Sequence, residues 1–137
     1  MTRTLGLDYG ERRIGVAVSD EVGIIAMPLC VIHVQNRRQV LSEIQRVCRE
    51  KNVEKIIVGM PINMNGTKGH SANSAVRFAE HISKYLSLPV EFWDERLSSR
   101  LAERILIDAD VRRSRRKMVI DKIAAQIVLQ SYLDAQI

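Results

Sequence analysis

Residues 5–20 read LGLDYGERRIGVAVSD, and this stretch decides the fold. Two runs of apolar and β-branched residues flank a short segment of glycine and charged residues, which is the pattern of two strands joined by a turn. We predict a strand over Leu5 to Asp8, a turn over Tyr9 to Arg13, and an antiparallel partner strand over Ile14 to Asp20. Asp8 therefore ends the first strand at the rim of a sheet.

Asp8 is a carboxylate at the end of an apolar strand. If it is half-buried among Leu5, Leu7 and Val16, it loses hydration worth several kcal/mol unless a cation or hydrogen-bond donors replace the water. A bound metal ion would supply that cation. The alternative is an aspartate that only caps the turn, and this strand alone does not distinguish the two.

The rest of the hydrophobic pattern predicts the remaining elements. Strands are expected at residues 26–34, 55–59 and 90–94, and helices at residues 37–51 and 71–86, after Ser98 or Ser99, and at about 117–135. Pro28 suits an edge strand because it has no amide hydrogen to donate, and Asn36 is placed to cap the first helix. Cys30 in a strand and Cys48 on an apolar helical stripe predict two buried free thiols.

The order of these elements predicts the fold class. Three consecutive strands form an antiparallel meander, and two later strands that follow helices run parallel. The expected fold is α/β: a five-stranded mixed sheet flanked by helices, in the ribonuclease H-like arrangement. A chain of 137 residues suits a single domain over residues 1–137. Ligands of such sheets gather beyond the carboxyl ends of the strands, where Asp8 and the pair Asp94 and Glu95 would project.

The fifth strand ends in two adjacent acids, Asp94 and Glu95. Side chains alternate along a strand, so only one of the two shares a face with Phe92, and the pattern leaves open which of them points toward Asp8. Alone, the pair is weak evidence for a site, because adjacent acids next to Arg96 also form ordinary surface ion pairs.

Asp121 is a third acid in an unexpected place. It interrupts the apolar stripe of the last helix, so it faces the core or its border. The small side chains of Ala124 and Ala125 would let this helix approach the sheet closely and carry Asp121 toward the strand ends. The alternative is that Asp121 only interacts with the positive end of its own helix dipole.

Together, three separate segments bring acids to one edge of the predicted sheet. Oxygen ligands without histidine or cysteine suit Mg²⁺ or Mn²⁺, and carboxylates shared between two such ions form a site that cleaves phosphodiesters. The three histidines are scattered, and we interpret His33 and His81 as structural. His70 in the long loop is not favoured as a proton donor.

The chain has a formal net charge of +5, and its basic residues are clustered. This clustering predicts a polyanionic partner. The alternative is a solvated basic surface. With 4% aromatic residues, contact with the backbone of a structured nucleic acid is favoured over a base-stacking platform. The basic residues expected to contact nucleic acid are Arg12, Arg13, Lys68, Arg96, Arg100, Arg112, Arg113, Arg115, Arg116 and Lys117. The residues Asn63, Asn65, Gly66 and Thr67 form a candidate phosphate-binding loop, although NMNGT is also simply a good turn.

Composition excludes some classes. No stretch approaches the roughly twenty apolar residues that a membrane span requires, and the N-terminus has no leader pattern. We therefore expect a soluble cytoplasmic protein without membrane contact.

Four motifs together resemble a known family. LGLDYG, VGMPINMNGT, WDERLSS and DKIAAQIVLQSYL, in this order over essentially the whole chain, resemble the bacterial YqgF (RuvX) family. LDYG alone would also fit the phosphate loop of actin-like ATPases. The resemblance implies a ribonuclease H-like nuclease, described either as a Holliday-junction resolvase or as a maturase for the 5′ end of pre-16S rRNA. It also implies that Asp8, Glu95 and Asp121 are the catalytic, metal-binding acids, with Asp94 as a possible helper.

We therefore expect a two-metal endonuclease that acts on structured RNA or branched DNA, with rRNA processing ahead of junction resolution. A resolvase makes two coordinated cuts and so needs a twofold dimer, but no dimerisation helix is visible, which leaves a monomer or a weak homodimer. Two other classes stay open. One is a nucleotide-binding ATPase module that uses Asp8, which normally needs a second domain, and the other is a non-catalytic RNA-binding scaffold.

Overall fold

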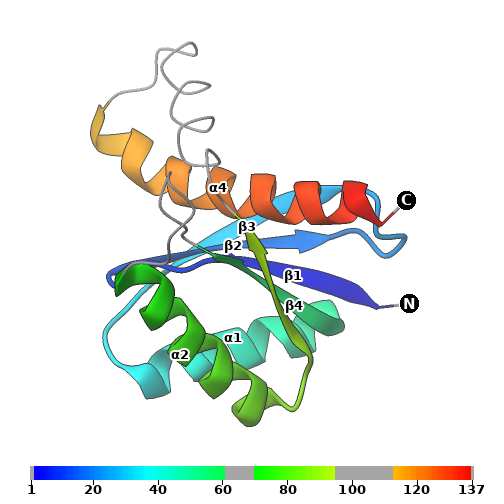
Figure 1. Cartoon of the computed structure of the whole chain (residues 1–137). Coiled ribbons are helices and arrows are strands. Elements are labelled where there is room, and N and C mark those ends of the chain that lie inside the picture. The colour runs from blue at the N-terminus through cyan, green and yellow to red at the C-terminus, as the bar shows by residue number, and fades with distance from the viewer. Residues whose placement is uncertain (1, 61–69, 95–112, 137) are drawn as a thin grey trace.

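The computed structural model describes residues 2–60, 70–94 and 113–136 (Figure 1). The strands are β1 (Arg3–Asp8), β2 (Arg13–Ser19), β3 (Ala26–His33), β4 (Val53–Met60) and β5 (Val90–Asp94). The helices in these ranges are α1 (Arg37–Lys51), α2 (His70–Leu86) and α4 (Arg113–Ala135), and none of them is long and apolar enough to cross a membrane.

The five strands form one sheet in the order β3-β2-β1-β4-β5. The first three strands are an antiparallel meander, and β4 and β5 continue the sheet in parallel with β1. This topology confirms the predicted mixed sheet. Pro28 lies in β3, which is an edge strand as expected.

Helices cover both faces of the sheet. Helices α1 and α2 lie on one face and α4 crosses the other (Figure 1). Leu5 and Leu7 of β1 belong to one buried cluster with Ile82 of α2. Ile57 of β4 belongs to a second buried cluster with Leu129 of α4. The sheet is therefore the middle of three layers, and its exposed chemistry is confined to its edges.

Helix α1 begins where its cap predicts. The Asn36 side chain accepts a hydrogen bond of 2.8 Å from the Gln39 amide, and the Gln39 side chain accepts one from the Asn36 amide in return. This reciprocal pair is a capping box, which satisfies two amide groups that the first helical turn leaves without partners. The helix ends at Asn52, whose φ of 55° is a left-handed conformation that asparagine tolerates.

Most element boundaries differ from the prediction by a few residues. Strand β1 begins at Arg3 rather than Leu5, β2 spans Arg13–Ser19 rather than Ile14 to Asp20, and β3 ends at His33 rather than residue 34. Strand β4 is longer than residues 55–59, α2 already begins at His70, and α4 begins at Arg113 rather than near residue 117. The basic residues 113–116 were expected to lie before the last helix, but they belong to it, because arginine and lysine are good helix formers. The helix expected after Ser98 or Ser99 lies outside the described residues.

Both cysteines are free thiols, but only one is buried. Cys48 lies on the inner stripe of α1 and is 6% exposed, and burial raises the pKa of its thiol to about 11. Cys30 is half-buried rather than buried, because it lies on the edge strand. Partial burial also raises the pKa of the Cys30 thiol.

Candidate active site at the carboxyl edge of the sheet

Asp8 lies at the carboxyl end of β1, half-buried, with a glycine-containing strand on either side. It pairs with Gly15 of β2. On the other side Leu7 pairs with Val58, so the next residue of β4 along the ladder from Asp8 is Gly59. Neighbouring strands are about 4.8 Å apart, so a larger side chain at either glycine on the same face would lie against the carboxylate. Both glycines are buried, and neither has a side chain that could lie against the carboxylate.

Gly6 shows which face of the sheet Asp8 occupies. A Cβ atom added at Gly6 would lie 2.7 Å from the Cβ of Leu129 and 3.3 Å from the carbonyl oxygen of Ala125, so Gly6 faces α4. Residues two apart in a strand share a face, which puts Asp8 on the α4 face as well. Leu5 and Leu7 lie in the opposite core. The expectation that these leucines surround Asp8 is therefore wrong, because strand alternation separates them.

Helix α4 runs antiparallel to β1. At the start of β1, Thr4 pairs with Lys55, whose ammonium donates a hydrogen bond of 2.6 Å to the hydroxyl of Tyr132. Further along β1, Gly6 meets Leu129. Residue numbers in α4 thus fall as those in β1 rise, and the amino-terminal part of the helix extends toward the carboxyl edge of the sheet.

In this direction Asp121 lies nearer the carboxyl edge of the sheet than Ala125 does. Asp121 precedes Ala125 by one helical turn, about 6 Å of rise, and Asp8 follows Gly6 by two strand residues, about 6.6 Å. Ala125 is fully buried, and the predicted close approach of α4 through its small residues is confirmed. The side chain of Asp121 lies outside the described part of the structure.

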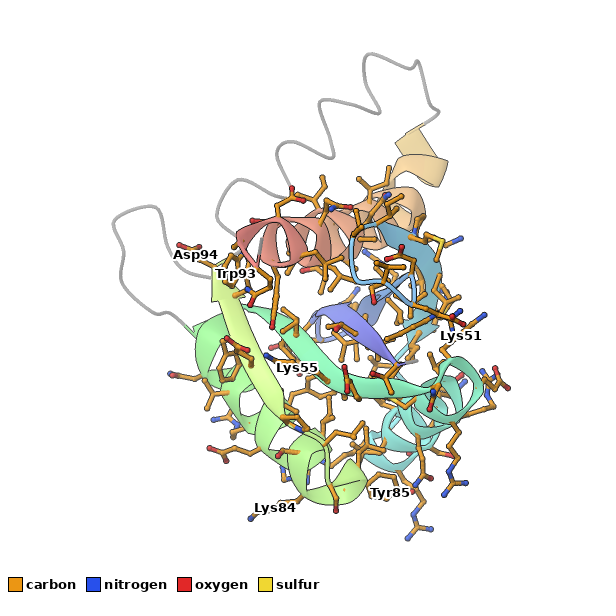
Figure 2. All side chains as sticks on the ribbon, turned by 90° about the vertical axis from the view of Figure 1, so that its right-hand side faces the viewer. Lys51, Lys55, Lys84, Tyr85, Trp93 and Asp94 are labelled. Atoms are coloured by element: carbon orange, nitrogen blue, oxygen red, sulfur yellow. The ribbon has the colours of Figure 1, made fainter. Side chains whose placement is uncertain are left out.

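Asp94 lies at the carboxyl end of β5 with an exposed side chain, two strands from β1 (Figure 2). Its neighbour Trp93 faces α4, where its indole nitrogen donates a hydrogen bond of 3.0 Å to Ser131. Phe92 packs against the α1–α2 core. By alternation Asp94 shares the face of Phe92, on the opposite side of the sheet from Asp8. Glu95 lies outside the described residues.

A group of polar and aromatic side chains holds the carboxyl-terminal half of α4 against the sheet. The Lys55 ammonium lies 2.6 Å from the Glu91 carboxylate and 4.9 Å from the centre of the Tyr132 ring, and the Trp93 ring lies 5.5 Å from the same ring. The hydrogen bond to Glu91 and, after it, the bond to Tyr132 raise the pKa of Lys55. These contacts hold α4 against β4 and β5, and so they help to fix the position of the helix along β1.

Two basic residues, Arg12 before β2 and Arg13 at its start, follow Asp8 closely in the chain. Arg12 is exposed, and Arg13 is half-buried and alternates with core residue Ile14, which puts Arg13 on the α4 face beyond Asp8. The turn is tight, because a Cβ atom at Gly10 would lie 2.5 Å from the carbonyl oxygen of Arg13. The other expected phosphate contacts are less defined. Arg113, Arg115, Arg116 and Lys117 begin α4 with side chains that are not described, and Lys68, Arg96, Arg100, Arg112 and the loop residues Asn63, Asn65, Gly66 and Thr67 lie outside the described residues.

The described side chains do not complete a metal site by themselves. Among the residues the structure describes, no three His, Cys, Asp or Glu side chains lie close enough to hold an ion. Asp8 is the one member of the predicted triad that is fully described. Gly15 was expected near Asp8 from the sequence, but Gly6 and Gly59 were missed, although a glycine one residue from a core position in each strand was the available signal.

These features define a class of protein. The strand order, the antiparallel meander followed by parallel strands, and an acid at the end of β1 are the features of proteins with the ribonuclease H-like fold. Comparison with solved structures agrees on the fold. The chain is similar to T. thermophilus RuvC in complex with a Holliday junction substrate, at 13% identity over 99% of this chain and 96% of that one, with a TM-score of 0.60. It is also similar to the yeast mitochondrial Holliday junction resolvase Ydc2, at 11% identity over 98% and 79% of the chains, with a TM-score of 0.57.

Sequence comparison identifies the family. Residues 2–135 match the model of the RuvX family, described as Holliday junction resolvase, and the chain belongs to this family. A relative from Syntrophomonas wolfei is 50% identical over 132 residues, covering 96% of this chain and 94% of its own. One from Geobacillus kaustophilus is 50% identical over 136 residues, covering 98% and 99%. Both relatives are provisionally named pre-16S rRNA nuclease.

Proposed function

We propose that this protein is a metal-dependent endonuclease, a single domain over residues 1–137, that processes the 5′ end of pre-16S rRNA in the cytoplasm. The names of full-length relatives at 50% identity support the substrate. The observation that supports the chemistry is the close contact of α4 with Gly6, because Asp8 follows Gly6 in β1 on the same face and Asp121 precedes Ala125 by one helical turn.

The proposed catalytic acids are Asp8, Glu95 and Asp121. Alternation with Trp93 favours the other face of the sheet for Asp94, so we do not assign it as a direct partner of Asp8. Its exposed carboxylate is left with a helper role at most. This choice leaves Glu95 as the acid that the fifth strand contributes.

These residues fit Mg²⁺ or Mn²⁺, because three carboxylates offer only hard oxygen ligands. Asp8 is half-buried, and its neighbours in the adjacent strands are Gly15 and Gly59, which have no side chains of their own. Two such ions, when bound, supply an activated water and stabilise the leaving 3′ oxygen. The role of the chain's own residues is to hold the carboxylates at one edge while Arg12 and Arg13 attract the phosphate backbone.

A second candidate function is resolution of Holliday junctions, which the description of the family favours. It requires a twofold dimer with two coordinated active sites, whereas a monomer or weak homodimer suffices for RNA processing. The two functions would use the same catalytic acids, but they differ in the oligomeric state that they require and in the nucleic acid that is cut.

The deciding experiment compares the two substrates directly. Purified protein is incubated with precursor small-subunit rRNA carrying its 5′ extension and with a four-way DNA junction, each in Mg²⁺, Mn²⁺ or EDTA. We expect cleavage of the RNA with either metal and none in EDTA. Cleavage of the junction alone, with a dimer in sedimentation, would favour the second candidate, and cleavage of neither would reject the nuclease.

Variants then test the acids. Asp8→Asn, Glu95→Gln and Asp121→Asn should each abolish cleavage and leave RNA binding largely intact, because they remove proposed metal ligands rather than phosphate contacts. Asp94→Asn is the matched control, since it neutralises an acid at the same edge but on the other face. Loss of cleavage in Asp94→Asn, with activity retained in Glu95→Gln, would reverse their roles.

A further inference from the structure

A pocket of about 280 Å³ opens at the same sheet edge, on the α1–α2 side. Its wall includes Tyr9 from the β1–β2 turn, Arg37 from the start of α1, and Arg77, Phe78 and His81 from α2. Pockets for drug-sized ligands usually span about 300–1,000 Å³. This volume therefore suits a single small group, such as one nucleotide.

The pocket is next to the proposed catalytic edge. Tyr9 directly follows Asp8, and consecutive Cα atoms are about 3.8 Å apart. Tyr9 packs against the α1–α2 core, whereas Asp8 lies on the α4 face. The pocket and Asp8 are thus reached from one strand end, on opposite sides of the sheet.

The walls of the pocket combine aromatic rings with cations. The rings of Tyr9 and Phe78 have centroids 4.6 Å apart with planes tilted by 32°, and both residues are half-buried. Arg37 and Arg77 are exposed. Within the described parts of the chain neither guanidinium has an acidic partner, and Arg77 reaches only the Ser74 hydroxyl, at 3.5 Å. Half-buried His81 adds a ring nitrogen.

This chemistry matches a nucleotide. A flat base can pack against the Tyr9 and Phe78 rings, and guanidinium groups without acidic partners bind the phosphate oxygens. A phosphate alone would not use the rings, and an apolar ligand would not use the arginines. The small number of aromatic residues in the chain excludes an extended stacking platform but not a site for one base.

We propose that this pocket binds one unpaired nucleotide of the substrate strand, beside the phosphodiester that is cut. The inference rests on the proposed nuclease function and deepens it: the enzyme would select a junction between paired and unpaired nucleic acid. A free nucleotide has the same chemistry, so the test must separate the two sources.

The test measures binding without cleavage. Fluorescence anisotropy in EDTA compares a blunt RNA duplex with the same duplex carrying a short single-stranded 5′ extension. The Arg37→Gln/Arg77→Gln variant removes the two pocket cations. The Arg38→Gln/Lys84→Gln variant is the matched control, because it removes the same charge from exposed positions on the same two helices that do not line the pocket.

We expect wild-type protein to prefer the tailed duplex and the pocket variant to bind it about tenfold more weakly, because the variant loses the charge-assisted contacts of two guanidinium groups with the phosphate. The slope of log affinity against log salt for the tail should become shallower by about 0.7 for each single-strand phosphate that the variant no longer neutralises. The control variant should bind the blunt and the tailed duplex more weakly than wild-type protein by the same factor. Equal weakening on both duplexes in the pocket variant, or none, would overturn the proposal.

The base is tested separately. Phe78→Leu keeps an apolar side chain against the core and removes the ring, and thermal unfolding checks that it folds. A tail with one abasic position should bind wild-type protein as weakly as the intact tail binds Phe78→Leu, with no further weakening when the two changes are combined. Additive effects would mean that the base lies elsewhere.

Two more arms complete the test. Binding of a free nucleoside monophosphate that is abolished in the pocket variant, without any tail preference, would assign the pocket to free nucleotides and overturn the proposal. Failure of the wild-type protein to cut any substrate in Mg²⁺ would reject the nuclease function instead. The binding arms in EDTA do not depend on that result.

Discussion

At the scale of single residues, Gly6 determines how near α4 can come to β1. The space that a side chain would need is occupied by Leu129 and by the carbonyl oxygen of Ala125. Glycine therefore permits a helix–strand contact that no larger residue allows. Since Asp8 lies two residues further along the strand on the same face, this contact fixes how closely α4 approaches the part of β1 that carries Asp8.

Gly6→Ala should destabilise the fold by about 1–3 kcal/mol, the usual range for overpacking, because the new Cβ would lie 2.7 Å from the Cβ of Leu129. It should also reduce cleavage by moving α4 away from Asp8. Denaturant unfolding and cleavage rates check both effects. Gly23→Ala is the control: its φ of 80° also costs roughly 1–2 kcal/mol, but nothing lies near the new Cβ. Equal cleavage by both variants would contradict a positioning role for Gly6.

Cys48 predicts how stability changes at alkaline pH. Its thiol pKa is raised by burial from 9.0 to about 11, so the folded state keeps a proton that the unfolded state loses first. Stability from this group is complete below about pH 9 and falls as the pH rises from about 9 to about 11. Unfolding in denaturant across that range measures the decrease, and Cys48→Ala should lose less stability over the same interval. An identical pH dependence in both proteins would show that the Cys48 thiol does not cause the loss of stability at alkaline pH.

At the scale of elements, α4 combines two functions along its length. Its second half packs on the sheet through Ala125, Val128 and Leu129 and is held by the contacts of Tyr132 with Lys55. Its first turns carry the basic residues from Arg113 onward. Because the helix is continuous, cations that were expected on an independent loop are attached to the element that also positions Asp121.

Neutralising Arg112, Arg113, Arg115 and Arg116 should weaken binding to every nucleic acid, because clustered cations bind mainly through phosphate attraction and counterion release. The slope of log affinity against log salt should become shallower by about 0.9 for each duplex phosphate that is no longer neutralised. Binding titrations at several salt concentrations measure the slope. Neutralising Arg46 and Arg49 on α1 is a control with exposed cations elsewhere. An unchanged slope would mean that the start of α4 faces away from the substrate.

At the scale of the whole molecule, the sheet separates two kinds of chemistry. The α4 face carries Asp8 and the carboxylate site proposed around it, whereas the α1–α2 face carries the aromatic and basic pocket at Tyr9. Both open at the carboxyl edge. A nucleic acid that crosses this edge can meet both, which a site confined to one face would not permit.

Metal preference distinguishes the nuclease from a nucleotide-binding ATPase. Mg²⁺ and Mn²⁺ should support cleavage, whereas Ca²⁺ should bind but support little, because its longer and looser coordination misplaces the attacking water. Cleavage assays with each ion, and calorimetry with Mn²⁺ and with ATP, make the comparison. Micromolar ATP binding that disappears in Asp8→Asn, together with no cutting of RNA or DNA, would favour the ATPase.

The sequence by itself determined the elements and the sheet. Hydrophobic periods of two and 3.6 residues, the Asn36 cap and the position of Pro28 are local signals, so the meander, the parallel strands and the approximate boundaries follow from them. The close approach of the last helix was also predictable, because Ala124 and Ala125 are small. The helical start at Arg113 was missed, since high charge resembles a loop when neighbouring packing is not known.

Only the tertiary structure decided which face each edge residue occupies. Alternation determines which residues of one strand share a face of the sheet. The register between strands and the packing of α4 decide whether that face is the α4 face or the α1–α2 face. For this reason only the structure shows that Asp8 lies on the α4 face, whereas Phe92 and Asp94 lie on the α1–α2 face. The pocket at Tyr9 is likewise built from segments far apart in the chain, and local sequence patterns do not encode contacts over such separations.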